Sequence, residues 1–179
     1  MADVSLAEEL ALQLSWHWEA QLRPRLQGLT DAEYLWEPVP GCWSIRPGPE
    51  GSWVPDFAWP QPEPPPVTTI AWRLSHLVVG VFGDRNARYF GGDPISYETY
   101  VYPPGAATSL ADLDAQVGRW LSGVRALTAE DLAQHCREPG YEQDSMAGLV
   151  LHISREAIHH GAEIALLRDL YLHGAGGRL

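Results

Sequence analysis

Apolar side chains recur every three or four residues along four long stretches of the chain, the spacing of helices that bury one face. In the first stretch the series is Leu6, Leu10, Leu14 and Trp18. Ser5 precedes this series and Glu8 follows three residues later, a capping-box pattern typical of a helix start. The periodicity predicts four long helices, over residues 4–26, 69–90, 109–126 and 145–172.

Two shorter helices are expected between the long ones. One follows Thr30, where Glu33 repeats the capping pattern, and the other runs from about Ala129 to Cys136. No segment shows the alternation of apolar and polar residues that marks a strand. Residues 92–108 form a crossover long enough to let the second and third helices run parallel. We therefore predict an all-α fold, a four-helix bundle in one domain that spans residues 1–179.

The segment between the first and second long helices has a composition of its own. Residues 37–66 hold most of the prolines together with Trp43, Trp53 and Trp59, and they end in a proline-rich run. Such a run favours an extended, polyproline-like loop over a helix. We expect this loop to lie across the open end of the bundle, either to shield a site there or to cover exposed core.

Composition and charge exclude several classes of protein. The 179 residues have a formal net charge of −11, and every basic residue is an arginine. This balance disfavours nucleic acid and anionic membranes as partners. The two cysteines, Cys42 and Cys136, lie far apart and form neither a disulfide framework nor a zinc ribbon. The sequence begins with no export-signal pattern and contains no run of ~20 apolar residues, so a cytoplasmic protein is expected.

The last predicted helix carries most of the candidate chemistry. His160 lies on the same side of this helix as its leucines, and Glu156 lies one turn earlier, where carboxylate and imidazole can converge on one ion. His152 continues the series but is about 12 Å from His160 along the axis, too far to share a metal. His159 with Glu163 is the competing pair. The spacing favours Glu156 with His160 and leaves His159, Glu163 and His152 as the alternative ligands.

A third ligand has to come from another helix, and His76 in the second helix is the candidate. It belongs to a line of residues on one face, several of them small, which allow close approach or leave space for a ligand: Thr69, Trp72, His76, Gly80, Gly83 and Ala87. A helical histidine is also often a hydrogen-bonded core or surface residue. His17 in the first helix could serve as a proton carrier or fourth ligand, or could simply pack.

Three motifs give the chain a resemblance to a known family. They are the segment 68–77 around His76, the segment 152–169 around His160 and, more weakly, Cys42-Trp-Ser-Ile-Arg-Pro47. With these motifs the chain resembles the DinB-like superfamily of bacterial metal-binding four-helix bundles. That family usually has one histidine on helix 2 and an HxxxH pair on helix 4.

The pair on helix 4 reads ExxxH here, as in the N-terminal domain of mycothiol-dependent maleylpyruvate isomerase. That similarity implies His76, Glu156 and His160 as the ligands. An alignment on His159 would instead place Arg155, which cannot coordinate a metal, at the upstream ligand position. The lack of lysine and the richness in alanine, glycine, arginine and proline suit an actinobacterial source, a group that uses mycothiol.

Two imidazoles and one carboxylate suggest a catalytic rather than a structural metal site. Such a set leaves one position open on a tetrahedral zinc ion, with nickel or iron as alternative metals. Zinc would lower the pKa of a bound thiol and make it a nucleophile near neutral pH. We therefore expect a transferase or isomerase that uses mycothiol or another small thiol against a small electrophile, with His17 as a candidate catalytic residue.

Three further expectations stay open at this point. Arg73 and Arg155 could bind substrate carboxylates or form salt bridges. The same ligands describe the site of a non-haem iron enzyme. A third reading is a non-enzymatic, metal-binding or dimerising bundle in stress physiology, since fold alone does not establish activity. Bundles of this kind often form homodimers, although no exposed stripe in the sequence indicates an interface.

Overall fold

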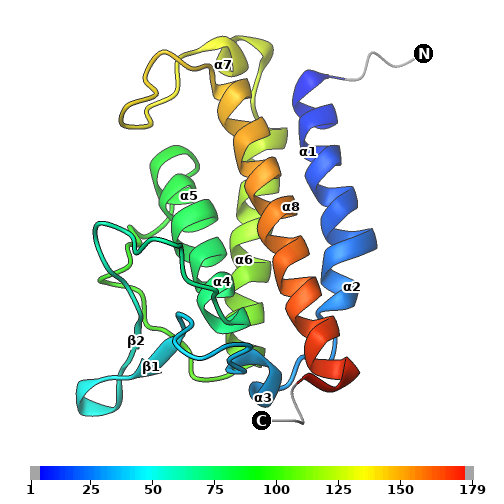
Figure 1. Cartoon of the computed structure of the whole chain (residues 1–179). Coiled ribbons are helices and arrows are strands. Elements are labelled where there is room, and N and C mark those ends of the chain that lie inside the picture. The colour runs from blue at the N-terminus through cyan, green and yellow to red at the C-terminus, as the bar shows by residue number, and fades with distance from the viewer. Residues whose placement is uncertain (1–4, 176–179) are drawn as a thin grey trace.

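The computed structural model describes residues 5–175, and it confirms the predicted all-α fold (Figure 1). The predicted start of the first helix at residue 4 and both ends of the predicted domain lie outside these residues. The first long helical segment consists of α1 (Leu6–His17), a π-helical stretch (Trp18–Leu22) and α2 (Arg23–Arg25). Pro24 has no N–H to donate to the preceding turn, which accounts for the wider π-helical turn before it.

The second long segment has the same construction. It joins α4 (Ile70–His76), a π-helical stretch (Leu77–Gly83) and α5 (Asp84–Tyr89). The Thr69 hydroxyl caps α4 by accepting a hydrogen bond from the Trp72 backbone N–H at 3.2 Å. The Gly80 carbonyl, within the π-helical stretch, accepts a hydrogen bond from Arg85. The widened stretch begins directly after His76, at the end of α4 that carries the candidate ligand.

The third and fourth long segments are α6 (Ala106–Arg125) and α8 (Met146–Leu170), the latter extended by a π-helical turn (Tyr171–Ala175). α6 begins earlier than the predicted Ser109, because the carboxylate of Asp31 accepts a hydrogen bond from the Ala106 N–H at 2.8 Å and caps the helix from a distant part of the chain. Ser109 is buried inside the helix. Ser145 caps α8.

Two short helices and one hairpin complete the described elements. α3 (Asp31–Tyr34) has the capping box of Thr30 and Glu33, and α7 (Ala129–Ala133) is shorter than the predicted helix. The strands β1 (Ile45–Pro47) and β2 (Trp53–Pro55) pair antiparallel, with Arg46 opposite Val54. Each strand is three residues long, too short to show the alternation that would predict it.

The four long segments pack around one core. α1 contacts α6 and α8, and α4 contacts the same two helices from the other side. In Figure 1, α4–α5 and α6 run upward while α1–α2 and α8 run downward, so the crossover joins two parallel neighbours. Trp120 of α6 fills the centre, with its ring 6.5 Å from that of Phe82. Within residues 5–175, no helix combines the length and apolar character needed to cross a membrane.

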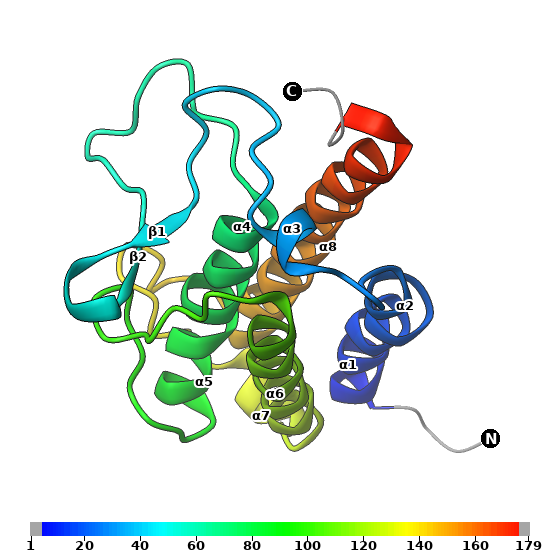
Figure 2. The ribbon, with the colours of Figure 1, turned by 90° about the horizontal axis from the view of Figure 1, so that it is seen from below.

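The proline- and tryptophan-rich loop lies outside the helices. Figure 2 shows it, with β1 and β2, on the α4 side of the bundle and away from α1. Backbone hydrogen bonds join Trp43 to Val67 and to Thr69, which fixes the loop to the start of α4. The loop is therefore anchored beside the helix that carries His76.

Candidate metal centre

The candidate centre lies between α4 and α8. His76 is the last residue of α4, and His160 projects from the middle of α8. Their ring centroids are 4.8 Å apart and their planes cross at 84°. Two residues separated by more than eighty positions in the chain are thus brought side by side, as the sequence motifs suggest.

His160 lies between two carboxylates of its own helix. Its Nδ1 is 2.7 Å from Oε2 of Glu163, and its Nε2 is 3.4 Å from Oε2 of Glu156. The first distance is that of a charge-assisted hydrogen bond, whereas the second is longer. Only 9% of the His160 side chain is exposed, so both carboxylates face a nearly dry imidazole.

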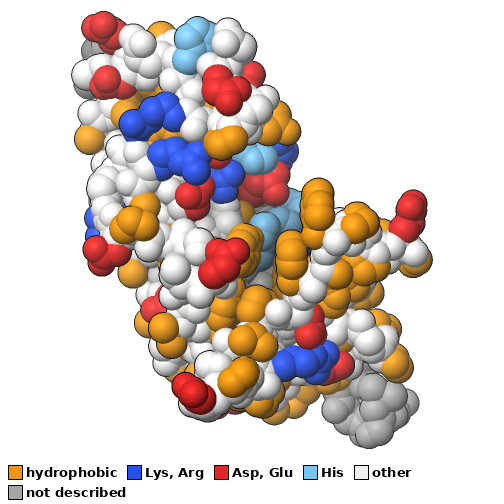
Figure 3. Space-filling model, turned by 90° about the vertical axis from the view of Figure 1, so that its left-hand side faces the viewer, with side chains coloured by type: hydrophobic (Ala, Val, Ile, Leu, Met, Phe, Trp, Pro, Cys, Tyr) orange, Lys and Arg blue, Asp and Glu red, His pale blue; other side chains and the backbone are white. Residues whose placement is uncertain are grey.

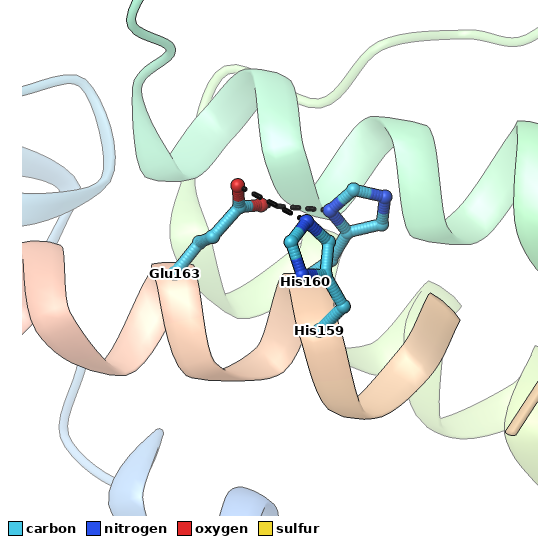
Figure 4. Close-up of side chains that lie close together, drawn as sticks. All are labelled: His159, His160 and Glu163. Atoms are coloured by element: carbon cyan, nitrogen blue, oxygen red, sulfur yellow. Dashed lines mark hydrogen bonds and ion pairs between the residues drawn. The ribbon is translucent and has the colours of Figure 1, made fainter. Parts of the chain in front are cut away.

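His159 contacts the same carboxylate from the outer side of α8. Its Nε2 is 3.5 Å from Oε1 of Glu163 (Figure 4). Among the described residues, His159, His160 and Glu163 form the group whose potential ligand atoms all lie within 4.8 Å of one another. The His159 side chain is 62% exposed, in contrast to His160. Two of the alternative ligands, His159 and Glu163, therefore converge with His160 at the rim of the site, whereas His152 is not part of this group.

Tyr97, in the crossover segment, is a member of the centre that the sequence does not predict. Its hydroxyl oxygen is 2.7 Å from Nδ1 of His76, and the two rings are nearly parallel. A Cβ at Gly80 would clash with this hydroxyl, and one at Gly83 would clash with Ile95. The small residues near His76 thus admit the crossover segment. Gly80 also lines the cavity beside His76, so close approach and free space, the two possibilities that the sequence leaves open, are both present.

The surroundings keep both imidazoles neutral. Burial, together with the nearby His160, Arg73 and Arg85, lowers the pKa of His76 to about 3. Burial also lowers the pKa of His160, although the hydrogen bond to Glu163 acts in the opposite direction. Neutral imidazole is the form that binds metal ions. Burial raises the pKa of Tyr97 to about 12, so its hydroxyl keeps its proton at neutral pH.

One of the comparisons with known proteins identifies the family of the chain. The model of the DinB superfamily matches residues 51–164, more than half of the chain. The chain belongs to the DinB superfamily. No curated protein and no solved structure gives a significant match. The matched part of this DinB-superfamily chain includes α4, the crossover and most of α8, and thus all residues of the candidate centre.

The donor atoms of the centre suit a divalent metal. Domains of the DinB superfamily are often metal-binding. The centre offers imidazole nitrogens and carboxylate oxygens, the ligands of catalytic zinc sites. In both buried histidines Nδ1 already has an oxygen partner, the Tyr97 hydroxyl for His76 and the Glu163 carboxylate for His160. This leaves the two Nε2 atoms available, as in zinc sites where a second oxygen holds each histidine in orientation.

Two arginines flank the centre in different ways. Arg73 lies one turn before His76, and its Nε is 2.9 Å from Oε2 of Glu163. Arg155 is 71% exposed, with its Nε 3.6 Å from Oε1 of Glu156. Arg73 is thus an inner partner of a carboxylate of the protein, whereas Arg155 faces solvent, and its Nη2 lies 2.5 Å from Nδ1 of His152.

The structure does not bring His17 to the centre. Its Nδ1 is 3.0 Å from Oε1 of Gln21, and it lines a separate cavity against Gly161 on another side of α8. His152 lies closer, at the edge of the cavity beside the centre, with its Nδ1 3.6 Å from Oε1 of Glu156. Sequence periodicity places His17 and His152 on helices. It does not show which of them lies near the face of α8 that carries the centre.

A cavity of about 400 Å³ opens beside His76. His76, Tyr97, Glu156 and His152 line it, together with Arg85. Figure 3 shows histidine side chains in a hollow, with arginines above it and hydrophobic side chains along its lower rim. Its volume is within the usual range of small-molecule sites. A ligand in this cavity would lie against His76 and Glu156.

Proposed function

We propose that His76, Glu156 and His160 bind a divalent metal ion, with Tyr97 and Glu163 holding the two imidazoles in orientation. The observation that carries this proposal is the matched pair of Nδ1 contacts, each at 2.7 Å, which leaves both Nε2 atoms free. Glu163 is already paired with Arg73, which makes it a better orienting group than a ligand. Glu156 has only longer contacts, at 3.4 Å and beyond.

We further propose that the metal is zinc and that the protein is a thiol-dependent transferase or isomerase. Zinc bound by two imidazoles and one carboxylate would keep an open position and would favour the thiolate form of a small thiol such as mycothiol. The protein side chains would shape the cavity around that thiol and its electrophile. Arg155, exposed at its rim, is the arginine that we propose for a substrate carboxylate, whereas Arg73 positions Glu163.

Zinc titration of single variants tests the ligand set. Zinc affinity is measured by competition with a chromogenic chelator, and bound metal by elemental analysis. His76→Ala, Glu156→Ala and His160→Ala should each weaken zinc binding by about a hundredfold or more, beyond the effect expected for an outer partner. His135→Ala is the matched control, because His135 is exposed and bonded to the Gln143 carbonyl on another part of the surface.

His159→Ala distinguishes the two possible ligand sets. It should leave zinc binding almost unchanged under this proposal. If His159→Ala abolishes binding while His76→Ala does not, the ligands are His159, His160 and Glu163. The thiol chemistry is tested separately, by the rate of thiol conjugation across a panel of small electrophiles. A rate that is equal in the parent protein and in His76→Ala, with both folded, would contradict a catalytic role.

One observation favours a second, non-enzymatic function. Arg73 and Glu163 form an ion pair, and Glu163 is also hydrogen-bonded to His160. A bundle with such internal pairing can be stable as a binding or dimerising protein without chemistry at the centre. In that case His76→Ala and Glu156→Ala would change the melting temperature at most. Bound iron with oxygen-dependent turnover would instead indicate a non-haem iron enzyme.

A further inference from the structure

A second cavity lies on the other side of His76 and Tyr97 from the first. Its volume is about 420 Å³, and it lies between the proline- and tryptophan-rich loop and α4. Six aromatic residues line it beside His76, together with smaller and polar residues such as Asp56 and Glu98: Trp43, Phe57, Trp59, Trp72, Tyr97 and Tyr102. His76 and Tyr97 border both cavities, so a molecule held here would reach the candidate metal centre.

The rings of this aromatic pocket are arranged along one continuous series. Trp43 is 5.7 Å from Trp72, and Trp72 is stacked on His76 at 5.6 Å with the planes 17° apart. The outer ring, Phe57, is 6.2 Å from Trp43. Aromatic faces of this kind favour offset stacking or edge contacts with another ring. The series leads from the outer edge of the loop directly to the candidate ligand.

Fixed polar contacts hold the pocket open. The Asp56 carboxylate accepts hydrogen bonds from Arg46 at 2.7 Å and from the Ser44 N–H at 2.9 Å. The Asp56 carbonyl accepts a hydrogen bond from the Trp72 indole at 2.9 Å, which ties the loop to α4. A pocket formed in advance costs less to occupy than one that must order on binding.

Two of the rings remain largely in water. Phe57 is 72% exposed and Trp59 is 85% exposed. Covering such apolar surface with an apolar ligand is favourable because the hydrophobic effect scales with the area removed from water. The incomplete burial therefore indicates a surface that a ligand could cover.

The charges around the pocket favour a neutral ligand over a cation. The Asp56 carboxylate is used by Arg46 and Ser44, and Glu98 is bonded to the Ser96 hydroxyl at 2.6 Å. The Arg73 guanidinium lies 5.3 Å from the centre of the Trp72 ring and already makes the cation–π contact there. Asp56 and the Trp72 ring are thus already used by arginines, and Glu98 is the one acid of this group without an arginine partner.

We propose that this aromatic pocket binds a planar, neutral apolar group, such as the aromatic ring of a substrate whose reactive end faces His76. The pocket as a binding site is independent of the metal, whereas the placement of the reactive end rests on the proposed function. The ring would stack among Trp43, Trp72 and Phe57. The pocket would then select for the apolar part of the substrate, and the metal centre for its reactive part.

Naphthalen-2-ylmethanol is a suitable neutral, planar probe. It is titrated into the ¹⁵N-labelled full chain, with and without zinc, while the indole N–H signals of the eight tryptophans are followed by NMR. The Trp43 and Trp72 signals should shift in a saturable way, and those of Trp16 and Trp120 should not. If the probe shifts these signals both with and without zinc, the pocket is supported whether or not zinc binds. A failure of the metal proposal is then seen separately, as a lack of zinc binding.

Phe57→Ala tests the outer wall of the aromatic pocket. Because the Phe57 side chain is highly exposed, this substitution should not impair folding. This substitution should weaken binding of the probe roughly fivefold, which corresponds to the usual free energy of one aromatic contact. Tyr141→Ala removes an equally exposed aromatic side chain from another loop and should have no effect. Cyclohexylmethanol, which is apolar but not planar, should bind more weakly. Tighter binding of tetramethylammonium, or shifts at Trp16 instead of Trp72, would overturn the proposal.

Discussion

Two clusters of buried polar side chains in this bundle differ in how completely their atoms are paired. At the lower end of the bundle, Glu33 is 2% exposed and accepts hydrogen bonds from the Thr30 N–H, the Thr30 hydroxyl and Arg168. We call these three residues the Glu33 cluster. At the candidate centre, His160 has one short contact, to Glu163, and one longer contact, to Glu156.

The comparison shows that burial of charged or polar groups does not by itself mark a functional site. In the Glu33 cluster each carboxylate oxygen has a fixed donor, which is what stabilises a helix cap and an ion pair. At the centre His76 lines a cavity, and the Nε2 atom of His160 faces the Glu156 carboxylate at the longer distance of 3.4 Å. Ligand atoms without a short partner, next to space for a ligand, are the feature that distinguishes the centre.

The largest expected effect concerns the Glu33 cluster. Glu33→Ala removes the partner of Arg168, which is only 12% exposed, and should reduce the free energy of unfolding by about 3 kcal/mol. Urea unfolding at pH 7 measures this loss. Zinc affinity of the folded fraction should stay unchanged. A loss of zinc binding without a loss of stability would show that the two clusters have been assigned the wrong roles.

A smaller effect is expected where Tyr97 orients His76. Tyr97→Phe keeps the ring but removes the hydroxyl that contacts Nδ1, and should weaken zinc binding roughly tenfold, the lower end for an outer partner. Gly80→Ala should act in the same direction, because its Cβ would meet the same hydroxyl. The melting temperature of metal-free Tyr97→Phe should differ little from that of the metal-free parent. Tyr141→Phe provides the control, and equal zinc affinities in all three variants would contradict an orienting role.

Acid should weaken the Glu33 cluster. Burial would raise the pKa of the Glu33 carboxyl, but the hydrogen bonds from Thr30 and Arg168 outweigh it, so the pKa lies below its usual range. The stability that this group contributes is present above the usual glutamate pKa and is lost as the pH falls toward the lowered value. Urea unfolding of metal-free protein between about pH 6 and about pH 3 should therefore show a steeper loss in the parent than in Glu33→Gln. Parallel curves would contradict this assignment.

The sequence predicts the long helices because a 3.6-residue apolar period is a local property that needs no knowledge of neighbours. It does not predict the start of α6, since the cap comes from Asp31, far away in the chain. The facing of His76 and His160 is expected from their motifs and is present in the structure. Whether these residues bind metal stays a prediction.

The rest of the centre depends on tertiary contacts that periodicity does not encode. Tyr97 belongs to a crossover without a repeating pattern, so only the folded chain shows its contact with His76. Glu163 is three residues after His160 and four after His159, and helical spacing allows either pair. The Glu163 carboxylate makes its shorter contact with His160, because Arg73 from α4 holds this carboxylate on the inner side of α8. A contact across two helices thus sets the position of the Glu163 carboxylate, which helical spacing alone leaves open.

The smallest expected effect separates the exposed arginine of the centre from the buried arginine of the Glu33 cluster. Arg155→Ala removes a 71% exposed ion pair and should change stability by less than about 0.5 kcal/mol and zinc affinity by less than about twofold. Arg168→Ala, by contrast, leaves Glu33 buried without its partner and should lower the free energy of unfolding by about 3 kcal/mol.

If Arg155 binds a substrate carboxylate, Arg155→Ala should raise KM for an anionic electrophile with little change in kcat, because an interaction of equal strength in ground and transition states is lost. A fall in kcat at constant KM would instead place Arg155 in the chemical step.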